Sequence, residues 1–173
     1  MIELKQYDIA AQKFYDTQQI NSLPILSWDS YGLHFDRLTK FSRDIVVLNQ
    51  LAKEHGWQSS LSLNEALLEK DNVIVVTDAK LKIVHASHNI IHMNGYEVTD
   101  IIGESPKMFQ GKDTCKDTSV YISNAIKRKC GFEATILNYR KDGSPYKCWI
   151  KGEPLFNKKG KVVHFIAYEK EVA

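Results

Sequence analysis

The spacing of apolar residues changes once along the chain, and this change divides the sequence into two parts. Over residues 1–70 no strand-like alternation occurs, and apolar residues recur at spacings of three and four, which is typical of amphipathic helices. The pattern predicts a first helix over Tyr7–Ile20, a second over about Asp29–His55 and a short third from Ser62 to Lys70. We therefore expect residues 1–71 to form a helical extension.

From Asn72 onward, short β-branched runs and alternating segments indicate strands separated by turn residues. Lys141-Asp142-Gly143 is a clear hairpin turn, and short apolar stretches between the second and third strands predict small helices. We expect residues 72–173 to form one α+β domain around a five-stranded antiparallel sheet, with the short helices on one face. The predicted strands are Val73–Thr77, Lys82–Ala86, Phe132–Arg140, Pro145–Pro154 and Val162–Lys170.

Composition narrows the class of protein. Hydrophobic residues make up 43% and charged residues 25% of the chain, as in an ordinary soluble globular protein. A net charge of +2 without a dense basic stripe argues against nucleic-acid binding, and no run approaches the ~18 apolar residues of a membrane span. The three cysteines lack metal-ligand spacing, and the N-terminus lacks the pattern of a signal peptide. We expect a cytoplasmic protein that binds neither nucleic acid nor membrane.

Signatures of catalysis and of metal binding are missing from the sequence. It contains no G-x-S-x-G elbow, phosphate-binding glycine loop or H-E-x-x-H motif. His85, His88 and His92 lie close together in sequence, but a strand followed by a helix scatters them, and no cysteine or carboxylate follows at ligand spacing. We expect neither an enzyme nor a metal site.

The order of elements from Asn72 onward resembles the PAS family, in which two strands and short helices precede a three-strand meander. Leu137–Gly143 and Phe156–Ile166 resemble the last strands of the light-oxygen-voltage (LOV) branch of that family, and Gly103–Gly111 resembles its photoactive loop. The resemblance implies a PAS fold with a ligand cavity on one sheet face and a role in signal transduction.

Within the loop, the resemblance places Pro106 where LOV domains carry the cysteine that bonds to an excited flavin. Proline has no thiol, so the cysteinyl adduct cannot form. By the same comparison Ser105 replaces an asparagine, Lys107 replaces a phosphate-pairing arginine, and Gln110 is kept.

On the strands, the resemblance matches Asn138 to one of two asparagines that hold the flavin ring. Cys148 replaces the second, and Glu169 replaces a glutamine. Because an ionised carboxylate only accepts hydrogen bonds, Glu169 suits a flavin poorly unless it is protonated. We therefore expect no cofactor, and flavin mononucleotide is disfavoured. The candidate cavity positions are Asn138, Gln110, Cys148, Glu169 and Lys107.

Each cavity candidate also has a purely structural interpretation. Asn138 is equally well explained as a buried polar residue at a strand end, and Cys148 as a small buried residue with an inert thiol. Glu169 lies near the end of the last strand, and we expect it to be a solvated carboxylate. Phe, Ile, Val and Met side chains can fill the interior and leave no ligand space.

The opposite sheet face is more apolar than a solvated face, which is typical of a contact surface. We expect the N-terminal helices to cover it, as flanking helices do in PAS proteins, and to support a homodimer or contact with a separate signalling protein. Because the chain ends at Ala173, directly after the last strand, we expect the readout to pass to such a partner. The predicted outer residues are Leu137, Tyr139, Trp149, Ile166 and Tyr168.

Together these features favour a non-catalytic PAS-type module for sensing and protein interaction, in which signal travels through helices packed on the outer face. One alternative is a cofactor-binding photosensor or redox sensor without the cysteinyl adduct. Another is a small-ligand-binding protein in which Asn138, Gln110 and Lys107 hold an anion.

Overall fold

The computed structural model describes residues 25–58 and 72–172, together with Lys13. The chain divides into two units, residues 1–38 and 39–173, and each unit is described by itself. The helices predicted over Tyr7–Ile20 and Ser62–Lys70 lie outside the described residues, apart from Lys13, which is helical.

One long helix, α2, spans Ile25–His55. It confirms the helix predicted over about Asp29–His55 and begins a few residues earlier, directly after Pro24. Gly56 ends it with a φ of 62°, a left-handed conformation that glycine adopts without strain. In the part of the chain that the structure describes, no helix has the length and apolar character needed to cross a membrane.

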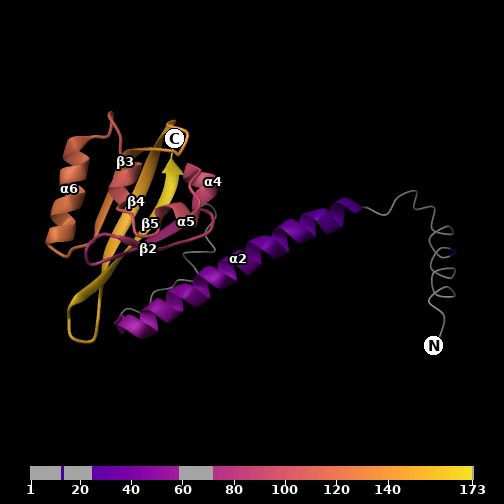
Figure 1. Cartoon of the computed structure of the whole chain (residues 1–173), viewed down its shortest axis with the longest axis horizontal. Helices are drawn as coiled ribbons and strands as arrows, with labels where there is room; N and C mark the ends of the chain where they lie inside the picture. Colours follow the sequence, from indigo (N-terminus) through magenta and orange to yellow (C-terminus); the bar gives the residue numbers. More distant parts are fainter. Residues whose placement is uncertain (1–12, 14–24, 59–71, 173) are drawn as a thin grey trace. The chain divides into compact units, whose positions relative to one another are not determined.

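Five antiparallel strands form a single sheet in the order β2-β1-β5-β4-β3 (Figure 1). This confirms the predicted α+β fold with a five-stranded antiparallel sheet. The last strand of the chain, β5, lies in the middle of the sheet between β1 and β4, because the meander folds back onto the first strand. The strands are β1 Val73–Asp78, β2 Ile83–Ala86, β3 Phe132–Tyr139, β4 Pro145–Phe156 and β5 Val162–Val172.

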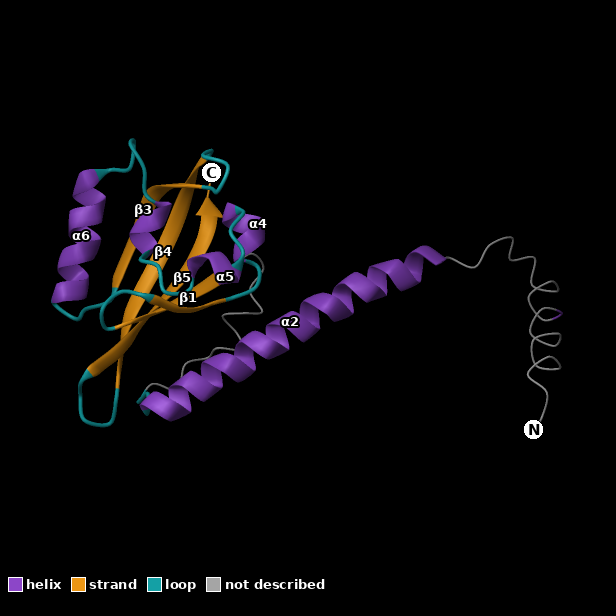
Figure 2. Cartoon of the chain, in the orientation of Figure 1, coloured by secondary structure: helices purple, strands orange, loops and turns teal. Residues whose placement is uncertain are grey.

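Short helices between β2 and β3 lie on one face of the sheet, which we call the inner face (Figure 2). Local sequence explains their ends. Gly95, with a φ of 76°, closes the first helix, and Ser105 precedes Pro106, which opens the 3₁₀ helix η1 as proline does at a first helical position. The helices are α4 Ile90–Asn94, α5 Val98–Ile101, η1 Pro106–Phe109 and α6 Lys116–Lys127.

The sheet separates two hydrophobic clusters. Side chains alternate along each strand, so neighbouring residues of β1 enter different clusters. The inner cluster contains Val73 and Val75 of β1 with Phe109 of η1. The outer cluster contains Ile74 of β1, which packs with Leu48 of α2. Residues 39–55 of α2 therefore belong structurally to the unit that holds the sheet.

Candidate functional site

A cavity of about 360 Å³ lies between the inner face and the helices η1 and α6. This volume falls within the range of pockets that bind small molecules, roughly 300–1,000 Å³. All the sheet strands except β2 contribute to its lining, and most of the lining is apolar.

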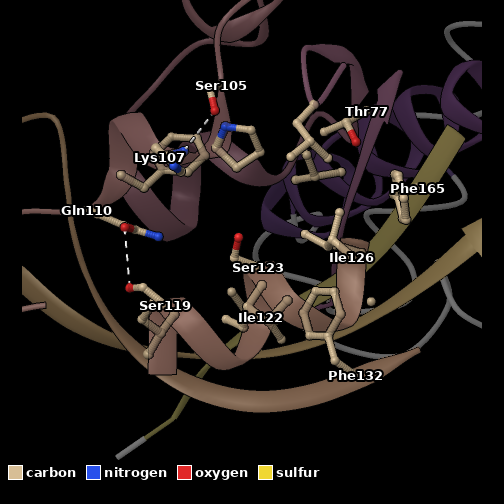
Figure 3. Close-up of a pocket in the computed structure, with 18 of the residues that line it drawn as sticks. Thr77, Ser105, Lys107, Gln110, Ser119, Ile122, Ser123, Ile126, Phe132 and Phe165 are labelled. Carbon is tan, nitrogen blue, oxygen red and sulfur yellow. Dashed lines mark hydrogen bonds between the residues drawn. The ribbon is translucent and has the colours of Figure 1, made fainter. Parts of the chain in front are cut away.

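Helix α6 covers the cavity without packing tightly on the strands. It has no fully buried residue, although one side of it turns toward the cavity (Figure 3). That side repeats at helical spacing and combines small and apolar residues, which leave room beneath the helix. The residues are Ser119, Ile122, Ser123 and Ile126.

The loop around η1 supplies polar groups to the cavity lining (Figure 3). The Ser119 Oγ lies 3.5 Å from the Gln110 Oε1, and this contact links the loop to α6. Lys107 lines the cavity beside Gln110, so both predicted loop candidates lie at the site. Pro106 also lines it, and among the described residues no cysteine does.

Phe132 and Gly152 close one side of the cavity. They are direct partners in the β3–β4 register, and the Phe132 ring lies over Gly152. A Cβ atom on residue 152 would collide with the Phe132 ring, so any larger residue there displaces the ring. Glycine in a strand often marks such a close approach.

Glu169 is buried in the cavity lining, with only 4% of its surface exposed. The expectation of a solvated carboxylate was wrong because β5 runs on to Val172 between β1 and β4, so position 169 is not a free strand end. Its polar contact is the Cys148 thiol, whose Sγ lies 3.8 Å from the Glu169 Oε2. Burial raises the pKa of Glu169 to about 7.

Cys148 and Asn138 lie on the same face but differ in their access to the cavity. Cys148 is fully buried in the inner cluster and is not part of the lining. Burial, followed by the charge of Glu169, raises the pKa of its thiol, and a protonated thiol is a poor nucleophile. Asn138 is almost fully buried and does line the cavity.

Thr77 is a site residue that the sequence interpretation missed. It lines the cavity from β1, and its buried Oγ1 has no hydrogen-bond partner among the described residues. Period-two alternation from Val73 and Val75 could have identified it, because the same face of the strand continues to Thr77. A buried hydroxyl without a partner is unfavourable, so this group suits a ligand atom.

The predicted outer residues occupy three different environments. Ile166 is fully buried in the outer cluster, and Tyr168 packs against that cluster. Trp149 is half-buried, donates from its Nε1 to the Glu133 Oε1 at 2.9 Å and carries the Lys170 ammonium over its ring. Leu137 is also half-buried.

Tyr139, the fifth predicted outer residue, turns to the edge of the sheet. Its ring lies against Gly111, in the loop before α6. Its hydroxyl donates to the Asp113 carboxylate at 2.8 Å and accepts from the Asp113 backbone N–H at 3.1 Å. Because β3 is an edge strand, a side chain that starts on the outer face can bend around the edge of the sheet. The alternation of residues along the strand does not reveal this.

Helix α2 is held on the outer face by two polar clusters as well as by apolar packing. At one cluster, the buried Asp44 carboxylate accepts from the His88 backbone N–H at 3.0 Å and lies 2.8 Å from the His88 Nδ1. The His85 Nε2 lies 3.7 Å from the same carboxylate. His85 and His88 therefore meet a carboxylate from α2, and among the described residues no group of three or more ligating side chains could hold a metal.

The second cluster lies where α2 ends. The Trp57 indole N–H donates to the His164 Nδ1 at 3.1 Å, and the His55 ring packs edge-on against the His164 ring. The Gln58 backbone N–H then donates to the Phe156 carbonyl at 2.9 Å. The docked segment is thus tied at Asp44 to the turn after β2, and directly beyond its end to β4 and β5.

Comparisons with known sequences identify relatives of this chain. A family model described as a PAS domain matches residues 71–172. Protein TWIN LOV 1 of Arabidopsis thaliana is 31% identical over 140 residues, which cover 79% of this chain and 35% of the relative. Phototropin-2 of Oryza sativa subsp. japonica is 33% identical over 117 residues, 66% of this chain and 13% of the relative. The chain thus spans only a minor part of these curated relatives.

Solved structures share the fold. The dark structure of the blue-light photoreceptor Aureochrome1 LOV matches with a TM-score of 0.60 and 30% identity, covering 67% of this chain and 86% of that one. A light-oxygen-voltage domain described with a flavin analogue matches with a TM-score of 0.61 and 26% identity, covering 66% and 87%.

These likenesses contradict the expectation that no cofactor is bound. The similar structures are LOV domains, and one is described with a flavin analogue. The expectation gave too much weight to single polar contacts at Lys107, Cys148 and Glu169. The space in the cavity depends instead on Gly152 and on the small residues of α6.

Proposed function

The chain belongs to the PAS domain family, and from this premise we propose that its cavity binds a flavin and that the domain acts as a sensory module without a cysteinyl adduct. PAS domains of the LOV type are sensory modules, and residues 71–172 match the family. The observation that carries the proposal is the cavity of about 360 Å³ on the inner face of a LOV-like fold.

The lining suits a flat, largely apolar ring with a few polar atoms. Apolar side chains of α6 and the strands form most of the walls, and Thr77 presents a hydroxyl without a partner. Asn138 and Gln110 offer amides that both donate and accept, and Lys107 offers a cation for a phosphate. Bound there, a flavin would supply blue-light absorption and electron acceptance. Pro106 has no thiol, which supports sensing without the covalent adduct.

For signal output, we propose the outer face. Residues 39–55 of α2 pack on it through Phe41 and Leu48, and polar contacts tie this segment at Asp44 and, directly beyond its end, at His164. A change in the cavity would reach α2 through β1 and β5, whose residues alternate between the two faces. We further propose a non-catalytic role, with the readout passing to a second copy or to a separate signalling protein. In this scheme residues 72–173 form the sensory domain and residues 1–71 the extension.

The test is the absorbance of the purified full chain between about 350 and 500 nm. We expect a flavin spectrum, either as purified or after addition of riboflavin or flavin mononucleotide. Illumination should leave the peptide without a flavin–thioether bond in mass spectra. A chain that remains colourless and binds neither compound would contradict the proposal.

A second candidate is binding of a smaller anionic ligand. It is favoured by Lys107 and Gln110, which line the same part of the cavity. Native mass spectrometry of the chain as purified separates the two candidates, because it gives the mass of any retained ligand.

A further inference from the structure

Glu169 is the one acidic residue among the described residues that line the cavity. Its backbone lies in the middle of the sheet, paired with Val73 on one side and Ile150 on the other. Only 4% of its surface is exposed, so its carboxyl group has little contact with solvent outside the cavity.

Among the residues that the structure describes, no cation forms an ion pair with this carboxyl group. On β4, the Cys148 thiol contacts Glu169, and the Tyr146 hydroxyl interacts with its charge. On β3, the neutral amide of Asn138 lines the cavity. The walls from β1 and α6 are uncharged. Lys107 lines the cavity from η1, yet among the described residues it forms no ion pair with Glu169. Glu171, two residues on, is exposed and pairs with Arg140 at 2.7 Å.

An ionised carboxylate in such surroundings is costly once a neutral ring fills the cavity. The ring removes the remaining solvent around the carboxylate, and an uncompensated charge in an apolar site costs several kcal/mol. Protonated, the same group is neutral and can donate one hydrogen bond. The burial that already raises its pKa to about 7 acts in the same direction.

We propose that Glu169 couples ligand binding to proton uptake: an uncharged flavin ring enters this cavity only with Glu169 protonated, and each binding event above neutral pH takes one proton from solvent. This inference rests on the proposed function and adds a specificity-determining residue to it. Well below pH 7 the group already holds its proton, so affinity there is independent of pH. Above pH 7 affinity falls roughly tenfold for each pH unit, or about 30-fold at pH 8.5.

Riboflavin is the probe that tests the coupling, because the phosphate of flavin mononucleotide itself titrates near pH 6. The full chain, freed of any ligand that co-purifies, is titrated with riboflavin from pH 6 to 8.5, and binding is followed by flavin fluorescence. Wild type should show the alkaline loss of affinity. Glu169→Gln keeps the shape without the acid and should bind equally at every pH. Glu171→Gln removes the exposed neighbour and should keep the wild-type slope.

A second measurement does not depend on any variant. Calorimetric titration of wild type at pH 8, in two buffers of different ionisation enthalpy, should give an uptake of about one proton per riboflavin. A flat pH profile in wild type, or the same slope in Glu169→Gln, would overturn the inference while leaving flavin binding intact. If neither riboflavin nor flavin mononucleotide binds any variant at any pH, the proposed function fails and the inference with it.

Discussion

The two faces of the sheet differ in how their buried polar groups are hydrogen-bonded. On the outer face, Asp44 is paired with His88 and His164 with Trp57, and the His85 Nε2, which has no hydrogen bond among the described residues, lies 3.7 Å from the Asp44 carboxylate. On the inner face, Thr77 has no partner among the described residues, and the polar contact of Glu169 is a weak one with a thiol. Among the described residues, these outer polar groups thus lie beside partners from the chain itself, whereas the inner face is better suited to a second molecule. This difference is why we assign output to one face and ligand to the other.

The faces also respond oppositely to pH. Glu169 has a raised pKa in the fold, so its contribution to stability is present below its unfolded pKa and is lost as pH rises toward 7. His85 and His164 have pKa values lowered chiefly by burial, so their contribution is present above 6.5 and is lost as pH falls. Asp44 partly opposes the shift at His85, and Asp78 opposes the one at His164.

The largest expected effect comes from breaking the outer face at Leu48, which is fully buried. Leu48→Ala leaves a cavity between α2 and the sheet and should lower the free energy of unfolding by about 2–5 kcal/mol. Urea denaturation measures the loss, and hydrogen exchange should show faster opening of α2. Val47→Ala is the matched control, because Val47 is 41% exposed, and it should change stability by less than about 0.5 kcal/mol. Equal effects of both changes would contradict the docking of α2.

The next largest effect is expected on the stability of the ligand-free chain, through the buried Glu169 on the inner face. Between pH 4.5 and 7, the unfolded chain releases the Glu169 proton before the folded chain does, so the folded state loses about 3 kcal/mol. Glu169→Gln should remove this loss and be more stable than wild type at pH 8, as followed by urea denaturation across pH. Glu171→Gln should retain the wild-type profile, and identical profiles for all three proteins would refute the burial of a titrating acid.

A smaller effect is expected at the polar cluster on α2. Asp44→Asn keeps the size of the side chain but loses the charge-assisted contacts to His88, which should cost about 1–3 kcal/mol. Urea denaturation at pH 7.5 measures this cost. Glu54→Gln, an exposed change on the same helix, should cost less than about 0.5 kcal/mol.

The smallest effect should appear only in acid. His164→Gln removes a group that must stay neutral beside Trp57 and His55, so the variant should lose less stability than wild type between pH 7 and 5.5. Thermal melts at both pH values, compared with those of an exposed-residue variant such as Lys158→Gln, measure the difference. An unchanged acid sensitivity would assign it to other groups.

Local sequence predicts the strands well because alternation and turn residues act over a few positions, as at Lys141–Gly143 between β3 and β4. It fails where distant segments meet. The burial of Glu169 depends on β1 lying beside β5, and the Trp57–His164 contact joins residues 107 positions apart. Alternation alone also does not reveal that the Tyr139 ring lies against Gly111 at the edge of the sheet.

Gly152 influences the size of the cavity indirectly, through the position of the Phe132 ring. Its missing side chain lets the Phe132 ring rest on the strand, so the depth of the cavity is decided beneath the ring rather than by the residues a ligand would touch. Adding one methyl group there would displace the ring. The shape of this part of the cavity is therefore set by a glycine, although no polar residue of the lining is involved.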